Sequence, residues 1–529
     1  MIRKLVDFAI ENRFLVLAAA LLLFIWGAVS FHQLPIEAYP DVADNYVEII
    51  TQWPGISAEQ IEQQVSVPLE IAMNGIPHLV HLRSFSLFGL SDLKLIFDDE
   101  EENAWNRERV LERLSQVTLP PGVSPQMGTD WSPVGQIYFF TLHSTNPQYD
   151  VMDLKSLEDW VVEKNFKAVP NIVDVASFGG PTREYQVRLD PDKLIAYGLS
   201  IAQVEQQLTN NNANAGGSFI EAGQQQINVR EVGQVRNVSD IANTVITAKN
   251  GAPLRIRDIA VVAQGPKIRL GQFAKAIHRE DGKIIDNDDL VSGIVLLRKG
   301  ADADLALKGI HAKVEELNNR ILPAGVKVVP FIDRSDLVHY TTHTVLHNLT
   351  EGIVLVVIVL FLFVGNVRAA IIVALTIPFA LLFAATCLNL KGIPANLLSL
   401  GALDFGMVVD GAVVMVENIV RHMTEGDNTS RNPTDVVREA AHEVQRPVFY
   451  AIAIIITAYM PIFTLQRVEG RLFRPMAWTV AFALLGALIF SMLIAPVLST
   501  LLFRKGVREW NNPAMAYSID RYRKAVKYA

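Results

Sequence analysis

The sequence has very little cysteine, little charge and no nucleotide-binding loop, and each shortage excludes a class of protein. The single cysteine, Cys387, lies inside an apolar block of the 529-residue chain, which excludes a disulfide framework and a cysteine-based metal site. No GxxxxGK(S/T) loop is present, so the residues give no sign that ATP supplies energy. Only 19% of the residues are charged, and a net charge of −8 argues against nucleic acid as a partner.

What the chain has in abundance is hydrophobic residues, which make up 50% of it and are concentrated in long blocks. A block of roughly 20 residues crosses a hydrocarbon core of about 30 Å. No small-x-small cleavage site follows the first block, FLVLAAALLLFIWGAVSF from Phe14, so we expect an uncleaved anchor and not a signal peptide. A long polar region follows. Five further spans are then predicted at about 343–364, 369–390, 396–420, 447–466 and 476–503.

Basic residues in the short loops predict the orientation, because cytoplasmic loops carry an excess of lysine and arginine. Most of them fall on one side of the predicted spans: Arg3, Lys4, Arg13, Arg368, Arg421, Arg431, Arg438, Arg446, Arg504, Lys505 and Arg508. Arg467, Arg471 and Arg474, in RVEGRLFRP, fall on the opposite side. The balance predicts a cytoplasmic N-terminus and a polar region outside the membrane.

The polar region, 32–340, has the pattern of globular α+β modules. NYVEIITQW from Asn45 predicts a strand, and Ser57 begins a helical pattern with a Ser-x-x-Gln start typical of a capping box. A hairpin around Gly89 and a second helix in NAWNRERVLERLSQV complete a split β-α-β unit. A similar series recurs, and it is interrupted by a β-rich insertion at roughly 181–272.

The predicted fourth span carries three carboxylates, Asp404, Asp410 and Glu417, in LDFGMVVDGAVVMVEN. A charged group at the bilayer centre costs about 2.5–3.5 kcal/mol on insertion scales, so such residues mark functional sites by default. Helix geometry places Asp410 and Glu417 within about 20° of one another and Asp404 about 120° from Asp410. The three acids therefore form a ladder along two faces of one helix.

These acids have two interpretations. They could pair with basic groups and simply hold the bundle together. No lysine or arginine lies inside any of the six predicted spans, however, so a partner would have to come from another chain or segment. An unpaired buried carboxylate can take up and release a proton near neutral pH, which makes a proton path the sharper hypothesis.

Three histidines at the start of the second predicted span, His339, His343 and His347, are spaced i, i+4, i+8 and followed by Glu351. Imidazole is a common zinc or nickel ligand. Four groups along one helical stripe cannot surround a single ion, so an interfacial face with solvated histidines is the alternative.

The chain resembles the N-terminal half of a resistance-nodulation-division (RND) transporter of the heavy-metal-efflux branch. The resemblance covers essentially the whole sequence, including LPIEAYPDV, PGISAEQIEQQVSVPLE, GGPTREYQVRLDPDKLIAYGLS, IPANLLSLGALDFGMVVDGAVVMVEN and PIFTLQRVEGRLFRPMA. It implies a polytopic α-helical membrane protein with ferredoxin-like porter subdomains and an inserted docking domain outside. The implied boundaries are 1–31 (N-terminus and first span), 32–180 and 273–340 (porter subdomains), 181–272 (docking domain), 341–503 (spans two to six) and 504–529 (an interfacial helix).

The same resemblance implies a secondary transporter, not an enzyme. It would lie in the bacterial inner membrane as a homotrimer with a periplasmic adaptor and an outer-membrane channel, with protons as coupling ion and no cofactor. Drug exporters of the family have two adjacent aspartates, and here Asp410 matches the first while Gly411 replaces the second. The Asp-Phe-Gly element that supplies Asp404 resembles that of exporters of divalent zinc, cobalt, nickel or cadmium.

Two departures from the family pattern stand out. Arg467 takes the place of a common glycine, and the chain is about half the usual length, so a C-terminal half with the usual lysine partner would be missing. Two alternatives therefore stay open. One is a non-transporting fragment or adaptor-binding scaffold, and the other is an exporter of a non-metal small molecule.

Overall fold

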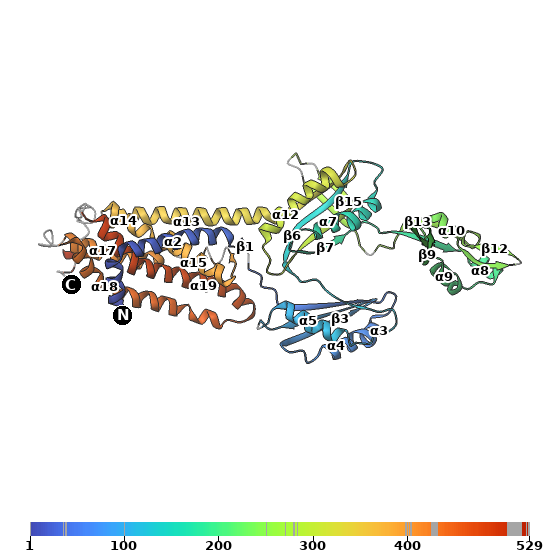
Figure 1. Ribbon diagram of the computed structural model, residues 1–529, viewed down its shortest axis with the longest axis horizontal. Helices are drawn as coiled ribbons and strands as arrows, with labels where there is room; N and C mark the ends of the chain where they lie inside the picture. Colours follow the sequence, from blue (N-terminus) through green and yellow to red (C-terminus); the bar gives the residue numbers. More distant parts are fainter. Residues whose placement is uncertain are drawn as a thin grey trace.

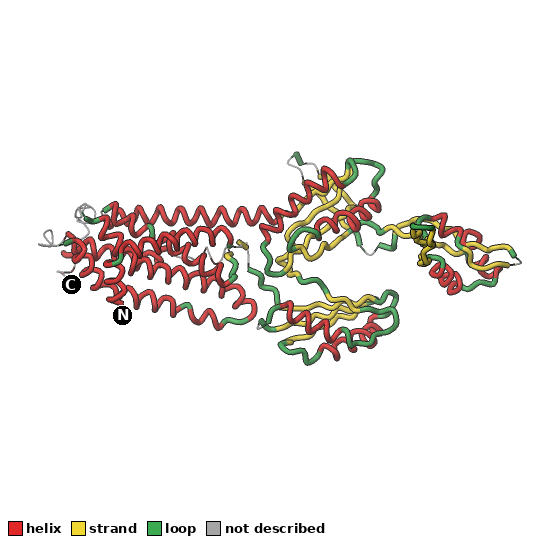
Figure 2. Tube along the Cα trace, in the orientation of Figure 1, coloured by secondary structure: helices red, strands yellow, loops and turns green. Residues whose placement is uncertain are grey.

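The structure, a computed structural model, is elongated, with a helical bundle at one end and α/β units beyond it (Figures 1 and 2). It describes residues 2–34, 36–37, 40–99, 101–249, 251–269, 271–278, 281–282, 284–364, 366–396, 399, 401, 405–424, 432–504, 521–524 and 526. Both chain ends lie at the end of the bundle that is remote from the α/β units (Figure 1).

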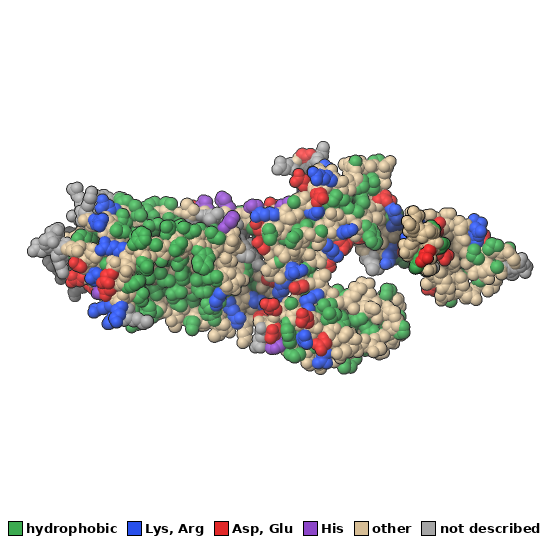
Figure 3. Space-filling model, in the orientation of Figure 1, with side chains coloured by type: hydrophobic (Ala, Val, Ile, Leu, Met, Phe, Trp, Pro, Cys, Tyr) green, Lys and Arg blue, Asp and Glu red, His purple; other side chains and the backbone are tan. Residues whose placement is uncertain are grey.

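Long apolar helices form the bundle, and their exposed hydrophobic side chains cover much of its surface (Figure 3). Within the described residues, four helical segments are long and apolar enough to cross a membrane: Arg13–Gln33, Val367–Lys391, Pro433–Thr464 and Arg467–Leu502. The elements of this part are α1 (Ile2–Glu11), α2 (Arg13–Gln33), α13 (Arg334–Val364), α14 (Val367–Ala374), α15 (Thr376–Lys391), α17 (Phe405–Thr424), α18 (Pro433–Ala458), η5 (Met460–Thr464), α19 (Arg467–Ile489), η6 (Phe490–Ile494) and α20 (Ala495–Leu502). The predicted span at 343–364 lies within α13, and the predicted span at 396–420 includes most of α17. Helix α17 differs from the four apolar segments because it carries Asp410, Glu417 and Arg421.

Local chemistry fixes where several of these helices begin and end. The Asn366 side chain accepts from the Arg368 backbone N–H at 2.9 Å, and Asn432 accepts from Thr434 at 3.2 Å, so both cap a helix. Helix α15 ends at Gly392, whose φ of 65° closes the last turn in the left-handed region.

Helices α2 and α15 approach each other unusually closely at Gly27. A Cβ placed on this glycine would lie 2.6 Å from Leu382 Cβ and 2.8 Å from the Leu382 carbonyl oxygen. The contact therefore requires a residue without a side chain, and it sets the first span directly against α15.

The first α/β unit has the ferredoxin-like β-α-β-β-α-β order. Its antiparallel sheet runs β3-β4-β2-β5, and helices α3, η1, α4 and α5 supply apolar side chains such as Ile61, Leu69 and Val110 to its core. The Ser57 side chain accepts from the Gln60 N–H at 3.4 Å, at the helix start that the sequence predicts. The elements are β2 (Asn45–Gln52), α3 (Ala58–Ile61), η1 (Glu62–Ser66), α4 (Val67–Met73), β3 (Leu79–Leu87), β4 (Leu90–Phe97), α5 (Asn103–Leu114) and β5 (Pro125–Met127).

The second α/β unit repeats this topology. Strand β15 pairs with β6 on one side and with β7 and β14 on the other, and β16 pairs with the far side of β6. The helices again pack their apolar faces on the sheet around Phe140, Phe166 and Ile310. The elements are β6 (Trp131–Ser144), α6 (Val151–Leu157), η2 (Glu158–Val162), α7 (Glu163–Lys167), β7 (Ile172–Phe178), β14 (Phe273–His278), β15 (Ile284–Arg298), α12 (Ala303–Glu316), η3 (Leu317–Ile321) and β16 (Val326–Asp333).

A smaller unit is inserted between β7 and β14 and lies at the far end of the molecule (Figure 1). Strand β8 pairs with β13 at its base, and a small core forms around Leu194, Val204 and Ile256. A two-stranded ribbon of β9 and β10 projects from it, and all eight residues of β10 are exposed. The elements are β8 (Arg183–Leu189), α8 (Pro191–Tyr197), α9 (Ile201–Asn210), β9 (Asn214–Ala222), β10 (Gln225–Val232), α10 (Val238–Asn243), β11 (Val245–Lys249), β12 (Ala252–Arg255), α11 (Ile256–Ile259) and β13 (Ala260–Pro266).

The two ferredoxin-like units are attached to the bundle differently. Strand β16 of the second unit ends at Asp333, and α13 begins at Arg334 without a break. The first unit follows α2 through a linker in which β1 (Ile36–Glu37) pairs with β17 (Ala395–Asn396). An ionic contact made by Arg471, described below, adds a second attachment.

Arg471, near the start of α19, holds the first unit through charged hydrogen bonds that we name the Arg471 clamp. Its Nη1 donates to Asp44 Oδ1 at 3.0 Å and to the Val42 carbonyl at 3.1 Å, and its Nη2 donates to Asp99 Oδ1 at 2.7 Å. Beside the clamp, Lys299 Nζ of the second unit donates to the Asp44 carbonyl oxygen at 2.9 Å.

Candidate functional site

The helix that carries the predicted carboxylates is α17, and its exposed residues form one stripe. Gly406, Asp410, Val414, Glu417 and Arg421 are all exposed. Their spacing of four, four, three and four residues keeps them on one face of a helix. Asp410 and Glu417 therefore share a face, as the sequence predicts, and lie about 10 Å apart along the helix axis. Asp404 lies outside the described residues.

The remaining faces of α17 are packed tightly against the bundle. Buried side chains that include Val409, Met415 and Ile419 join the main apolar core. A Cβ placed on Gly411 would lie 2.9 Å from Ile452 Cδ1 and 3.5 Å from Ser491 Oγ, which shows how closely α18 and η6 approach. The position at which drug exporters carry a second aspartate is thus filled here by neighbouring side chains.

Polar contacts fix one end of α17 against α18. The buried Asn418 side chain donates to the Ala440 carbonyl at 2.9 Å and to Glu443 Oε2 at 3.0 Å. Arg421 and His422 each approach the Glu443 carboxylate to 3.3 Å. Glu417 makes no ion pair with any described residue, so the interpretation that it pairs with a basic group gains no support from this part of the chain.

The predicted histidine stripe lies along the outer side of α13. His339, His343, His347 and Glu351 are all exposed. The His343 and His347 rings stack with centroids 6.1 Å apart at an angle of 26°, and His347 Nδ1 lies 3.5 Å from Glu351 Oε1. Figure 3 shows histidine side chains gathered over α13 where the apolar surface of the bundle ends.

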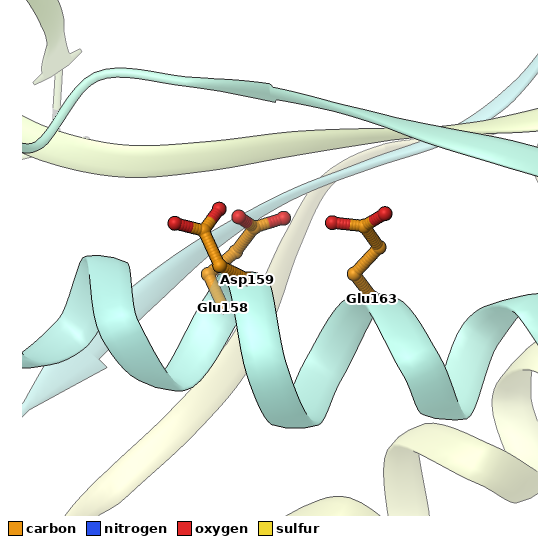
Figure 4. A group of neighbouring side chains, drawn as sticks. All are labelled: Glu158, Asp159 and Glu163. Atoms are coloured by element: carbon orange, nitrogen blue, oxygen red, sulfur yellow. The ribbon is translucent and has the colours of Figure 1, made fainter. Parts of the chain in front are cut away.

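A second acidic group, which the sequence analysis missed, lies on the first helix of the second unit. Glu158, Asp159 and Glu163 point their carboxylates to one side of this helix, and single oxygens of the three lie within 4.8 Å of one another (Figure 4). Glu158 is fully buried, and burial raises its pKa to about 7 despite the nearby Lys155 and Ser177.

A lysine already occupies the position that a cation would take in this group. Lys155 Nζ lies 3.2 Å from Glu158 Oε2 and 2.5 Å from Asp159 Oδ1, and it also contacts Ser177 Oγ. Burial lowers the pKa of Lys155, but the carboxylates outweigh burial and raise it, which keeps the ammonium charged. The group is therefore a buried ion-pair network and a poor metal site. The sequence does contain a signal for the burial of Glu158. It lies four residues, about one helical turn, from each of the apolar residues Leu154 and Val162, which are both buried.

Comparison of the sequence with models of known protein families shows which family the chain belongs to. Residues 5–529 match the model of the AcrB/AcrD/AcrF family. The chain belongs to this family.

Relatives of this AcrB/AcrD/AcrF-family chain agree with that assignment. The chain is 36% identical to Protein HelA of Legionella pneumophila, in an alignment that covers 100% of this chain and 50% of HelA. It is 38% identical to the cobalt-zinc-cadmium resistance protein CzcA of Cupriavidus metallidurans, in an alignment that covers 99% of this chain and 50% of CzcA. A solved structure described as a heavy metal efflux pump aligns with a TM-score of 0.82 and 41% identity, covering 94% of this chain and 48% of that one.

The predicted family and fold are therefore confirmed: this is an RND-type chain of the heavy-metal-efflux branch, similar to CzcA and CusA proteins. The chain spans about half the length of the curated relatives it matches.

Proposed function

We propose that this chain is the N-terminal half of a proton-driven exporter of heavy-metal cations, with Asp410 as the central proton carrier. The observation that carries the proposal is the exposed stripe on α17, which sets Asp410 and Glu417 on one face of a helix whose other faces are packed in the bundle. Carboxylates at membrane depth are expensive to keep charged, so they are kept where protons or ions move.

The uncovered stripe also fits the half-length relation to the relatives. A second half of a longer protein would cover this face and bring basic side chains to it; the six predicted spans themselves contain no lysine or arginine. Loss or gain of a proton at Asp410 would then change the attraction between the halves and shift the packing of α17. Glu417 extends the proposed proton path along α17, and Asp404 joins it on the strength of its place in the sequence.

The substrate proposal rests on the names of the relatives. One is named a cobalt-zinc-cadmium resistance protein, and the similar solved structure is described as a heavy metal efflux pump. Together with the sequence element that supplies Asp404, this supports divalent cations over a non-metal small molecule. The proposed activity is therefore secondary transport with protons as the coupling ion.

We place the protein in a bacterial inner membrane, with residues 32–340 in the periplasm, and propose a homotrimer that meets an adaptor and an outer-membrane channel. The ribbon of β9 and β10 supports the proposed trimer. A two-stranded ribbon exposed on both faces is only marginally stable in water, so contact with another chain would stabilise it. Its exposed Phe219, Ile220 and Ile227 would gain burial from a neighbouring copy.

The test is Asp410→Asn in the complete transporter that contains this chain, reconstituted in liposomes. We expect zinc flux driven by a pH gradient to fall at least about tenfold, because amide and carboxylate have the same shape but only the carboxylate takes up a proton. Glu469→Gln, an exposed acid in the first turn of α19, is the matched control and should leave the flux unchanged. Equal flux in the Asp410→Asn variant and the parent would favour the scaffold alternative.

A further inference from the structure

The histidine stripe on α13 has no role in the proposed proton path, and two of its histidines lie beside one another with a carboxylate one turn further on. We propose that His343 and His347 form a two-ligand site for a divalent transition-metal cation, with Glu351 as the group that orients His347. This inference deepens the proposed function, on which its biological role rests, by assigning a cation-binding position to the outer end of α13.

The spacing of the two histidines allows them to share one ion. Residues four apart on a helix have Cβ atoms about 5–6 Å apart, so two imidazoles at this spacing can direct one nitrogen each at the same ion. The His343 and His347 rings are neighbours on the helix surface, with centroids 6.1 Å apart and an angle of 26° between their planes. Both side chains are exposed, so an ion reaches them without any rearrangement of the bundle.

A carboxylate lies beside one ring nitrogen of His347. A ligating histidine usually has a carboxylate or carbonyl near its other ring nitrogen, which fixes the tautomer and raises the basicity of the ligand. Glu351 Oε1 lies 3.5 Å from Nδ1 of His347. With Glu351 beside Nδ1, Nε2 on the other side of the ring is the nitrogen available to a metal.

The α13 sequence carries no competing cation beyond its first residue. After Arg334, no lysine or arginine occurs in the α13 sequence through Val364. The acidic group around Glu158 differs on this point, because the Lys155 ammonium already lies 3.2 Å from Glu158 and 2.5 Å from Asp159. A metal ion approaching His343 and His347 has no such internal competitor along α13.

The surroundings also confine the site to the outer end of the helix. Glu351 borders a hollow of about 590 Å³ along α13, and beyond Gly352 the lining becomes apolar with Val354, Leu355 and Ile358. A hydrated cation gains nothing from that lining. The bound ion therefore stays at the level of the histidines.

The ligand types define which ions fit. Imidazole nitrogen favours zinc, nickel, cobalt and copper, whereas magnesium and calcium require oxygen ligands. Two protein ligands leave the other coordination positions to water, which suits an ion that is bound and released and not a structural site.

The experiment is titration calorimetry of the chain, purified without a histidine tag and placed in lipid nanodiscs, with zinc chloride as the probe. We expect His343→Ala and His347→Ala each to weaken the strongest zinc site at least about tenfold, and Glu351→Gln to weaken it about three- to tenfold. His339→Ala on the same stripe and His278→Ala in β14 should leave the affinity unchanged, and calcium should not compete.

Circular dichroism of each variant checks that α13 remains folded, which its exposed histidines should allow. Zinc affinity that is the same in the His343→Ala/His347→Ala double variant and the parent would overturn the site, as would equal competition by calcium. The result is separable from the proposed transport activity. Zinc binding is measured without a proton gradient, and Asp410→Asn should leave it intact whether or not that variant transports.

Discussion

The two ferredoxin-like units have the same strand order but are held to the bundle in different ways. In the second unit, β16 passes directly into α13, so the unit and a 31-residue helix form one continuous piece. The first unit has a linker, and the Arg471 clamp joins it to α19. Because the clamp consists of ion pairs at a partly exposed surface, it can open at a modest cost, whereas the helical connection cannot. We therefore expect the second unit to follow α13, and the first unit to move more freely once the clamp and its neighbouring Lys299 contact open.

The two units also differ in the polar group buried under their first helix. In the first unit, Ser66 Oγ lies 2.7 Å from both Ser86 Oγ and Ser91 Oγ. At the corresponding helix of the second unit, the buried Glu158 lies beside the half-buried Lys155 and Ser177. Hydroxyls do not titrate near neutral pH, but Glu158 does. One fold thus accommodates a neutral network under the first helix of one unit and a charged network under the first helix of the other, and of these two networks only the charged one makes stability depend on pH.

The largest expected effect comes from breaking the helical connection with Tyr340→Pro. A proline inside a helix removes a hydrogen bond and clashes with the preceding turn, at a cost of about 3 kcal/mol. We expect α13 to kink, so that spin labels at Glu315 in α12 and Leu390 in α15 give a broader distance distribution by double electron–electron resonance. Cys387 must first be replaced by alanine, because it is the one native cysteine.

The control for this change is Tyr340→Ala, which is tolerated because the side chain is 71% exposed. A second label pair, at Arg113 in α5 and Leu390, should keep its distribution in the proline variant. Broadening of both pairs alike would contradict the separate attachment of the two units.

The next effect concerns Glu158 and pH. Its pKa in the folded protein is raised from 4.5 to about 7 by burial, so the neutral form is favoured in the folded state. The group therefore stabilises the protein below about pH 4.5, and this contribution is lost as pH rises through about 7. The difference is about 3 kcal/mol.

Glu158→Gln should abolish this dependence while keeping the shape of the side chain. The variant should match the parent in thermal midpoint near pH 5 and exceed it near pH 8, measured by scanning fluorimetry. Subtracting the parent's thermal midpoint from that of the variant at each pH removes the contribution of all other titrating groups, because both proteins share them. A constant difference across that range would show that Glu158 does not titrate there.

The smallest effect comes from opening the Arg471 clamp with Arg471→Ala. The partner side chains of Asp44 and Asp99 are 46% and 49% exposed, so solvent screens the pairs. We expect a loss of about 1–2 kcal/mol for the contact as a whole. The Arg113–Leu390 label pair should broaden while the Glu315–Leu390 pair is unchanged, the reverse of the result for Tyr340→Pro.

Two further variants sharpen this result. Arg471→Lys should restore part of the narrow distribution, because a lysine can reach one of the two carboxylates. Arg83→Ala changes an exposed arginine that borders the same cleft, of about 630 Å³, without touching the clamp. If Arg83→Ala broadened the distribution as much as Arg471→Ala, the cleft as a whole and not the clamp would hold the first unit.

Features set by local spacing could be predicted from the sequence. The capped helix at Ser57, the hairpin at Gly89 and the shared face of Asp410 and Glu417 all follow from periods of two or 3.6 residues. Strand β7 was missed because its run, IVDVASF, is short and enclosed between a helix and a glycine turn. Strand β14 was also missed; it begins at Phe273, immediately after the end of the predicted insertion.

Features set by tertiary contact could not be predicted. Glu158 was missed because a charged residue suggests a surface position, although its neighbours Leu154 and Val162 place it on the buried face. Arg471 bonds residues 427 and 372 positions away, a separation that no local pattern encodes. The clamp nevertheless explains one of the three arginines that oppose the orientation rule, since Arg471 serves a protein carboxylate pair and not the membrane surface.

The close approach at Gly27 has a consequence at the level of the gene. Every amino acid that a single nucleotide change can substitute for glycine carries a Cβ, and a Cβ here would lie 2.6 Å from Leu382. No single-nucleotide missense change at codon 27 therefore preserves the contact between α2 and α15. In a population of sequences that keep this packing, the position can drift only through synonymous changes.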